Sequence, residues 1–339
     1  MQLIKTPTKG MNDYLPRETR LREYVKGVII RAYEKNGFSM IETPAVEHIE
    51  NLTGKNGGDN EKLIFKIMKR GEKLNEAAGN DAELCDSGLR YDLTVPLSRY
   101  YANNQAKLPS PFMAMQIGNV WRADRPQKGR FRQFTQCDID ILGDSTQLAE
   151  ITLISATTGV LRELGFDNFT VRINDRRLLK VCADYCGFKP EDCDKVFITL
   201  DKMDKIGLDG VKRELVEEDF DEASVEKYVA LYENCDAVSV SEFAADRLGG
   251  NGADIAASLE SIMRCATAAT AGGCSLKFDP TLVRGMSYYT GTIFEISMDG
   301  YGYSVGGGGR YDEMLAKFSG QKTPACGFSL GFERIVAAL

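Results

Sequence analysis

The stretch that most constrains the fold runs from Leu282 to Tyr311. Its residues 292–296 are mostly β-branched or aromatic, which favours a strand, and the Asp299-Gly300 pair that follows is typical of a hairpin turn. The chain can then return as a neighbouring strand from Ser304, and the glycine run 306–309 lets other groups approach the backbone closely. Taken alone, this pattern predicts an antiparallel hairpin with a glycine-rich edge.

The same stretch also carries side chains that suit a binding pocket. Arg284, the adjacent Tyr288 and Tyr289, and Glu295 on the predicted strand all lie close to the glycine run in the sequence. An arginine and two phenols beside accessible backbone fit a polar, anionic ligand. Both interpretations, scaffold hairpin and pocket, stay open until the rest of the chain is considered.

Length and charge set the general class. A chain of 339 residues predicts about two domains, and 43% hydrophobic with 27% charged residues is ordinary for a soluble globular protein. The net charge of -7 argues against indiscriminate binding of polyanions, although a local basic face can still bind nucleic acid.

Catalysis by histidine side chains, as in Ser-His-Asp hydrolases or HExxH zinc enzymes, would depend entirely on His48, because it is the only histidine. Residues 327–331 match the GxSxG pattern of a hydrolase nucleophile elbow, but that elbow needs a histidine later in the chain, and none follows His48. The chain also has no GxxxxGK[ST] sequence, so a bound nucleotide would not be held by a P-loop.

The nine cysteines are expected to be reduced thiols. No pair has CxxC spacing, and the group Cys182, Cys186 and Cys193 fits helical packing better than a metal site. The first residues lack an apolar core of signal-peptide length, and no apolar run approaches a membrane span. We therefore expect a soluble cytoplasmic protein.

The first third of the chain alternates helix and strand. A helix is predicted from Glu18 to Asn36, capped by Gly37, and a short strand from Phe38 to Pro44 follows it. A further strand is predicted over 63–68. At the next strand-to-helix junction Asp92 and Thr94 either cap the helix or point into a pocket.

Two predicted strands, 112–122 and 136–143, flank a basic loop. Asp138 and Asp140 share one face of the second strand because side chains alternate along a strand. The loop carries Phe131 and Phe134 among five cations: Arg122, Arg125, Lys128, Arg130 and Arg132. Such a loop is usually a solvated surface, but with anchoring strands it also suits an ATP-like ligand, with cations for phosphates and an aromatic ring for the base.

From Arg176 to Ala271 the pattern changes to helices joined by acidic linkers, and strand-rich sequence resumes near Ser275. This pattern predicts a helical domain inserted into a strand-rich core. We therefore expect a first core part over 1–174, a helical insertion over 175–271 and a second core part over 272–339.

Taken together, these stretches resemble the catalytic core of class II aminoacyl-tRNA synthetases, most specifically the histidyl-tRNA synthetases. Residues 37–44, 121–140 and 327–334 match the three class motifs, while 282–291 and 307–312 match segments specific to the histidine enzymes. The resemblance implies an α+β fold, in which a mostly antiparallel β-sheet is flanked by helices and carries a helical insertion. It also implies a homodimer formed through residues 37–44.

The resemblance assigns roles to individual residues. It implies that Arg122 and Arg284 are catalytic, binding the α-phosphate of ATP, with Arg122 also holding the histidine carboxylate. Residues expected to bind histidine are Asp92, Thr94, Arg122, Gln136, Asp140, Arg284, Tyr288 and Tyr289. Residues expected to bind ATP are Arg122, Asp124, Arg130, Phe134, Arg284 and Arg334. Mg²⁺ should accompany ATP, with ligands that the sequence does not identify.

The activity implied is ATP-dependent formation of histidyl-adenylate and transfer of histidine to its tRNA. Met286 and Ser287 depart from the leucine and aspartate usual in the family, and the chain ends at Leu339, soon after the third motif. We therefore expect that the C-terminal anticodon-binding domain of the family is absent and that transfer of histidine to tRNA is weakened. The chain would then be either a shortened form or a naturally short relative. The alternatives are a non-catalytic regulatory subunit of ATP phosphoribosyltransferase, which shares this fold, and an enzyme that activates an amino acid for an acceptor other than tRNA.

Overall fold

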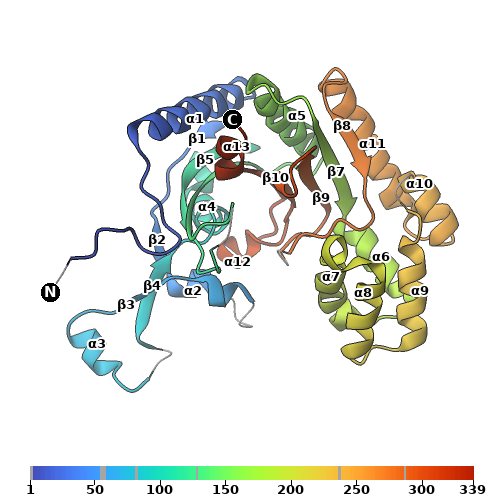
Figure 1. Cartoon of the computed structure of the whole chain (residues 1–339), viewed down its shortest axis with the longest axis horizontal. Coiled ribbons are helices and arrows are strands. Elements are labelled where there is room, and N and C mark those ends of the chain that lie inside the picture. Colours follow the sequence, from blue (N-terminus) through green and yellow to red (C-terminus); the bar gives the residue numbers. More distant parts are fainter. Residues whose placement is uncertain (1–2, 54–58, 81–82, 127–128, 236–237, 286–287) are drawn as a thin grey trace. The chain divides into compact units, whose positions relative to one another are not determined.

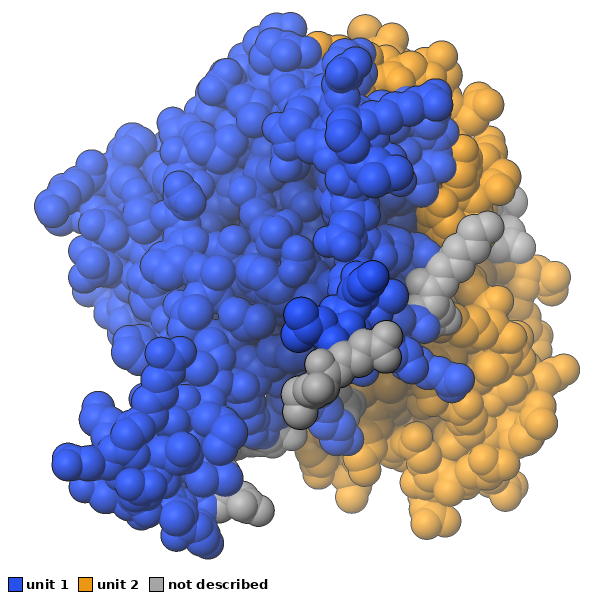
Figure 2. Space-filling view, turned by 60° about the vertical axis from the view of Figure 1, so that its left-hand side comes forward, with its two compact units in different colours: residues 1–140, 315–321, 329–339 blue, residues 141–314, 322–328 orange. Residues whose placement is uncertain are grey.

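The computed structural model describes residues 3–53, 59–80, 83–126, 129–235, 238–285 and 288–339. The chain forms two compact units, and Figure 2 colours each of them. Unit 1 contains residues 1–140, 315–321 and 329–339, and unit 2 contains residues 141–314 and 322–328. Figure 1 labels the helices and strands for which there is room.

Unit 1 begins with the predicted first helix, which is confirmed as α1, Pro16–Lys35, with proline in its first turn and Val25, Ile29 and Tyr33 fully buried. The helices that follow are α2 Ile49–Leu52, α3 Glu72–Glu76, α4 Thr94–Asn104, α12 Ala316–Ser319 and α13 Phe332–Ala338. The strands are β1 Ser39–Met40, β2 Val46–His48, β3 Lys66–Met68, β4 Cys85–Leu89, β5 Phe112–Trp121 and β6 Gln133–Leu142, whose last two residues belong to unit 2.

Two predicted strands of unit 1 are shorter than expected. The strand predicted over 38–44 is confirmed only at β1, Ser39–Met40, because the chain must leave the sheet before Pro44, whose nitrogen cannot donate a hydrogen bond. The strand predicted over 63–68 is wrong at its start, since a 3₁₀ turn spans Asp59–Leu63 and pairing begins at Lys66. Antiparallel β2, β4 and β3 form a small separate sheet in that order.

A buried arginine fixes the end of the first motif in unit 1. Arg90, only 8% exposed, donates from Nη1 to the backbone oxygen of Thr43 at 2.6 Å and from Nε to that of Asn119 at 2.9 Å. A Cβ at Gly118 would lie 2.4 Å from Nη2 of Arg90, so glycine is needed there. Arg90 thereby joins the segment after β1 to strand β5.

In unit 2 the predicted hairpin is confirmed as β9 Thr292–Met298 and β10 Ser304–Arg310, which pair antiparallel with a bulge between Ser304 and Gly306. The glycine run lies inside β10 rather than beside it. A Cβ on Gly308 would lie 2.0 Å from the backbone oxygen of Gly327, which explains why β10 needs glycine here. Strand β9 also pairs antiparallel with β7, Phe169–Asp175, and β7 pairs parallel with β8, Ser275–Phe278.

The large sheet has one strand order that can be followed through each unit. In unit 1 it runs β1-β5-β6-β11, and in unit 2 it continues β11-β10-β9-β7-β8, with β11, Ala325–Gly331, contributing residues to both. The predicted α+β class, a large sheet accompanied by helices, is confirmed.

The helices of unit 2 begin with α5, Leu148–Glu163. All described elements between β7 and β8 are helical: α6 Arg176–Cys186, a 3₁₀ turn Pro190–Asp192, α7 Cys193–Leu200, α8 Met203–Glu217, α9 Glu222–Tyr232, α10 Val240–Glu242, a π-helical turn Phe243–Arg247 and α11 Ala253–Ala269. The boundaries expected for an inserted domain, 175–271, remain a prediction. In the described part of the chain no helix is both long and apolar enough to cross a membrane.

Candidate active site

The first group of predicted site residues lies on the hairpin of β5 and β6 in unit 1. Arg122 follows β5, and its backbone nitrogen donates to the oxygen of Arg132 at 2.8 Å, which closes the hairpin. The Arg122 side chain donates from Nε to the backbone oxygen of Tyr91 at 2.9 Å, and its guanidinium carbon lies 5.1 Å from the centre of the Phe134 ring. The backbone oxygen of Tyr91 and the ring of Phe134 therefore both hold the Arg122 guanidinium in position.

Polar side chains on β6 and at the start of α4 form a buried acidic group. Asp92, Asp138 and Asp140 are 2–4% exposed and Gln136 is 9% exposed. Burial raises the pKa of Asp92, and burial together with Asp140 raises the pKa of Asp138 well above its usual range. The charge of Arg122 acts in the opposite direction on both carboxyls, so this arginine is the nearby cation that favours their ionised forms.

Two oxygen atoms of this group have no hydrogen-bond partner among the residues that the structure describes. They are Oδ2 of Asp92 and Oε1 of Gln136, and both are buried. Oδ1 of Asp92 accepts from the backbone nitrogen of Val95 at 3.0 Å, so Asp92 both caps the helix and keeps a second oxygen for something else. Thr94 is buried at the first residue of α4. Buried acceptors without partners are costly and usually belong to a binding site.

The remaining unit 1 residues predicted to bind ATP are less buried. Nε of Arg130 lies 3.8 Å from Oδ2 of Asp124, and the Arg130 side chain is 54% exposed. Such an exposed pair contributes little to stability and can open to a ligand. Arg334 lies on α13, two residues after Phe332.

The sequence did not reveal a buried ion pair between Arg22 and Glu333, which positions α13, the helix that carries Arg334. Glu333 accepts from Nη1 and Nη2 of Arg22 at 2.5 and 2.8 Å and from the backbone nitrogen of Thr135 at 3.0 Å. Both charged side chains are at most 10% exposed. Glu333 thus ties α13 to helix α1 and strand β6. The pair is separated by 311 positions, so no local pattern pointed to it.

In unit 2 the predicted catalytic residue Arg284 lies flat against strand β10. A Cβ on Gly307 would lie 2.5 Å from Nη1, 2.7 Å from Cζ and 2.9 Å from Nη2 of Arg284, so the guanidinium occupies the space that any other side chain would fill. Nη1 donates to Oε2 of Glu295 at 2.8 Å. Burial alone would lower the pKa of Arg284, but Tyr289 and Glu295 outweigh it and raise that pKa.

The tyrosine pair forms an aromatic group with Tyr311. The ring centres of Tyr288 and Tyr289 are 4.7 Å apart, and that of Tyr311 lies 5.9 Å from Tyr288. Tyr289 is 7% exposed and interacts with both Tyr288 and Arg284 through its hydroxyl. The two departures from the family pattern, Met286 and Ser287, lie outside the described residues.

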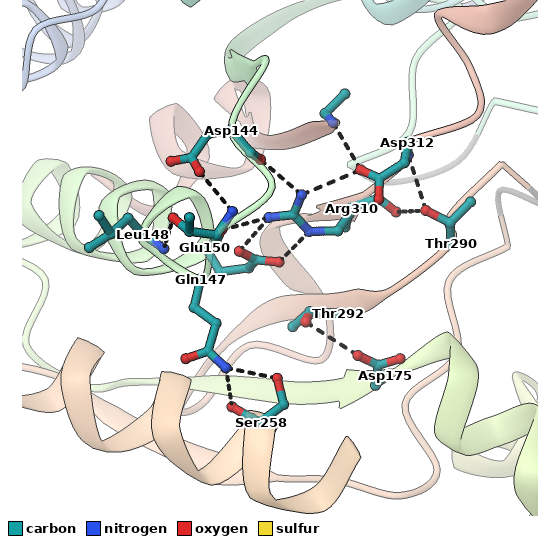
Figure 3. Close-up of polar contacts among 12 residues, drawn as sticks. Asp144, Gln147, Leu148, Glu150, Asp175, Ser258, Thr290, Thr292, Arg310 and Asp312 are labelled. Carbon is teal, nitrogen blue, oxygen red and sulfur yellow. Dashed lines mark hydrogen bonds and ion pairs between the residues drawn. The ribbon is translucent and has the colours of Figure 1, made fainter. Parts of the chain in front are cut away.

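Arg310 and Glu150 form a buried ion pair, which we call the clamp, and it fixes the segment around Thr290 that follows the tyrosine pair (Figure 3). Arg310 donates from Nε and Nη2 to the two carboxylate oxygens of Glu150 at 2.7 and 2.8 Å, and from Nη1 to the backbone oxygen of Asp144 at 3.1 Å. The backbone of Arg310 accepts from Thr290 at 2.8 Å. The Thr290 hydroxyl accepts from the nitrogen of Asp312 at 3.0 Å, so the residue after Tyr289 is fixed to the clamp.

The fold built around these residues is shared with known structures. The crystal structure of histidyl-tRNA synthetase from Nostoc sp. PCC 7120 matches with a TM-score of 0.83 and 27% identity, over 100% of this chain and 76% of that one. An ATP phosphoribosyltransferase regulatory subunit/histidyl-tRNA synthetase from Bacillus halodurans C matches with a TM-score of 0.81 but 23% identity, a likeness of fold alone. The chain thus has the catalytic fold of class II aminoacyl-tRNA synthetases.

Sequence comparison defines the family within that class. The family model described as "Histidyl-tRNA synthetase" matches residues 10–335. A histidine–tRNA ligase from Leifsonia xyli subsp. xyli (strain CTCB07) is 49% identical over 342 residues, which cover 98% of this chain and 79% of the relative. The chain belongs to the histidyl-tRNA synthetase family.

Proposed function

We propose that this chain activates histidine with ATP and transfers it to the 3′ end of histidine tRNA. A carboxylate oxygen of histidine would attack the α-phosphorus of ATP, forming histidyl-adenylate and releasing pyrophosphate. A ribose hydroxyl at the end of the tRNA would then attack the carbonyl carbon and release AMP. Membership of a family of histidine–tRNA ligases, at 49% identity to one of them, supports this activity.

One observation carries the proposal for the amino acid: buried oxygens of Asp92 and Gln136 have no hydrogen-bond partner in the part of the chain that the structure describes. An α-ammonium group brings three donors and a positive charge, which is what two buried acceptors, one of them anionic, require. Hydrogen bonds to charged groups contribute about 1.5–3 kcal/mol each, so this pair supplies substantial affinity for an ammonium. The remaining Oδ1 of Asp92, fixed by Val95, keeps the carboxylate in position.

By resemblance to the family, Asp140 and Tyr289 would recognise the imidazole, and Thr94 and Tyr288 would contribute to histidine binding. Both Asp140 and Tyr289 are buried, and Tyr289 is positioned by the Thr290 hydrogen bonds. A site that hydrogen-bonds to ring nitrogens rejects analogues that lack them by a large factor, because its own polar groups would be left unpaired. This composition selects histidine without using a histidine side chain.

The ATP phosphates would be bound by arginines on different elements. Arg122 after β5 and Arg284 over β10 would reach the α-phosphate, Arg334 on α13 the γ-phosphate, and Phe134 would stack on adenine beside Asp124 and Arg130. Planar guanidinium groups grip phosphates through two parallel hydrogen bonds. Fixed cations at the charge that develops on the phosphorus lower the barrier to displacement.

Mg²⁺ would accompany ATP and bind mainly through its phosphates. Among the described residues no group of three or more His, Cys, Asp or Glu side chains is placed to hold a metal ion. Mg²⁺ commonly keeps several waters and binds through phosphates with one or two carboxylates, so this chain's donors fit a nucleotide-borne ion. When bound, the ion would neutralise charge on the phosphates.

The experiment that tests the activity is histidine-dependent exchange of pyrophosphate into ATP by the whole chain. We expect exchange by the wild type and a loss of roughly 10³- to 10⁵-fold in Arg284→Ala, by analogy with other arginines at a phosphoryl group. Arg264→Ala, an exposed arginine on α11, is the matched control and should keep wild-type exchange. Histidine binding without exchange in the wild type would refute the enzyme and favour the regulatory-subunit alternative.

We further propose a homodimer through the region of residues 37–44 in the cytoplasm. Ser39 and Met40 are exposed, and they form the edge strand β1, whose unpaired side is available to another chain. All nine cysteines lie among the described residues as free thiols, in keeping with a reducing compartment. Light scattering should give twice the chain mass of 37.5 kDa, and a mass of one chain would contradict the dimer.

A further inference from the structure

In unit 2 the candidate catalytic arginine lies against a row of three residues on neighbouring strands of the sheet. The strand register places Gly307 of β10 opposite Glu295 of β9, and Glu295 opposite Arg172 of β7. Residues directly opposite one another on neighbouring strands point to the same face of the sheet. Because the Arg284 guanidinium fills the space above Gly307, the row reads arginine, glutamate, arginine across three strands.

Contacts follow this row with alternating charge. Nη1 of Arg284 donates to Oε2 of Glu295 at 2.8 Å, and the other carboxylate oxygen of Glu295 lies 3.7 Å from Nη1 of Arg172. Nε of Arg172 donates in turn to Oδ2 of Asp279 at 2.5 Å. Asp279 is itself fixed, since Oδ1 accepts from the backbone and hydroxyl of Thr281 at 2.9 and 2.7 Å. Nη1 of Arg172 also lies 3.4 Å from Oδ2 of the exposed Asp204, so the row is anchored at its Arg172 end.

Glu295 determines which edge of the Arg284 guanidinium is left for a ligand. A guanidinium presents donors along a planar fork, and each edge can hold one oxyanion. Glu295 engages Nη1, whereas Nε of Arg284 is buried and has no hydrogen-bond partner within the described residues. A buried donor without a partner is unfavourable, so the Nε edge is the one prepared for an anion.

The Glu295 carboxylate is only partly exposed, as are the two arginines beside it. Its side chain and those of Arg284 and Arg172 are only 20–23% exposed. The guanidinium plane is confined by the β10 backbone at Gly307, and the hydrogen bond to Glu295, together with the Tyr289 hydroxyl, limits its remaining rotation. Glu295 touches no reacting atom in this arrangement and acts through Arg284.

We propose that Glu295 is a positioning residue for phosphate recognition, which turns the Nε edge of Arg284 toward the α-phosphate, and that Arg172 holds Glu295 in that orientation. This inference rests on the proposed function, because it gives Arg284 a nucleotide phosphate as its ligand. It adds two residues, Glu295 and Arg172, that no resemblance assigned to the site.

The test compares Glu295→Gln with Asp201→Asn in the pyrophosphate-exchange assay. Glutamine removes the charge of Glu295 at almost constant shape. Asp201 is a matched carboxyl because the charge of Arg284 also acts on it, while no hydrogen bond joins the two among the described residues. We expect Glu295→Gln to lower kcat and kcat/KM for ATP equally, by about 10- to 100-fold as for a misplaced catalytic group, with little change in the KM for histidine. Asp201→Asn should stay within about 2-fold of wild type in both parameters.

Each possible outcome of these assays supports or refutes the positioning role of Glu295. Equal losses in both variants would overturn the inference in favour of a general charge effect, and wild-type exchange in Glu295→Gln would overturn it outright. If Glu295→Gln does not fold, Glu295→Asp, which keeps the charge but draws it back by one methylene, should show the same loss of kcat. In an Arg284→Ala background Glu295→Gln should cause no further loss, and an additive loss would refute action through Arg284. Absence of exchange in the wild type would refute the proposed function itself.

Discussion

Replacing Gly307 by alanine tests whether the position of the Arg284 guanidinium over β10 matters for activity. The φ angle of Gly307 is outside the left-handed region, so alanine can adopt the backbone conformation without strain. Its Cβ would lie 2.5 Å from Nη1 of Arg284, whereas ordinary contact begins near 3.4 Å. The guanidinium would therefore have to retreat by about 0.9 Å, and since it is the end of a flexible side chain it can do so while the strand stays in place.

A displacement of that size should cost activity rather than stability. Moving Nη1 away from the β10 backbone breaks the 2.8 Å hydrogen bond to Glu295, so the fork also loses its orientation. A misplacement of about 1 Å at a catalytic group can lower the rate by about 10²-fold. We expect Gly307→Ala to lower kcat in pyrophosphate exchange by about that factor, with a Tm within about 2 °C of wild type, equivalent to less than about 1 kcal/mol.

Gly302→Ala is the matched control in the same hairpin, because a Cβ there would meet nothing within 4 Å. It should keep both the exchange rate and the Tm of the wild type. Wild-type exchange in Gly307→Ala would refute the reasoning, since Arg284 could then work from a different position. A large fall in Tm without a change in kcat would show that the glycine serves packing alone.

Two more predictions concern unit 1. Glu333→Gln removes the charge that binds the buried Arg22, and breaking such a pair should cost about 3 kcal/mol or more of unfolding free energy in denaturant titration; a loss under about 1 kcal/mol would contradict it. Asp138 has a pKa raised by burial and by Asp140 above the value of about 3.9 in an unfolded chain, so its ionisation opposes folding: that cost is absent below about pH 4 and grows as the pH rises through the folded pKa. Asp138→Asn should therefore raise Tm over wild type at pH 8 more than at pH 4, and an equal gain at both would refute this cause.

Much of the fold could be predicted from the sequence, because periodicity and turn residues act locally. The helix α1, the hairpin of β9 and β10, and the long run of helices after β7 follow from such patterns. The errors lie where the pattern is short. At β1 only two residues pair, and at β3 a 3₁₀ turn replaces the predicted start, because neighbouring strands and not local propensity decide where pairing begins.

For the site, the sequence identified residues that could touch a ligand but not the residues that hold them. Asp92 illustrates the limit, since capping and binding were alternatives from the sequence and the structure gives one carboxylate oxygen to the helix while the other is without a partner among the described residues. From the sequence, the glycine run was expected to let other groups approach the backbone closely, but the group that does so could not be named. In the structure Gly307 serves to make room for a guanidinium, which only the position of Arg284 reveals.

The sequence analysis named Glu295 near Arg284 but gave it no supporting role, and it did not identify Glu333 or Glu150 at all. Glu333, Glu150 and Glu295 each accept a hydrogen bond from an arginine that lies 311, 160 and 11 positions away, respectively. Each is largely or wholly removed from solvent, where an unpaired charge would be costly, so each pair requires both partners to be in place. The arginine thereby acquires a fixed direction, which a flexible side chain lacks by itself. Fixed cations suit phosphate binding. In this chain the partly exposed Glu295 fixes Arg284 directly, the buried Glu333 fixes the helix that carries Arg334, and the buried Glu150 fixes the segment that holds Tyr289.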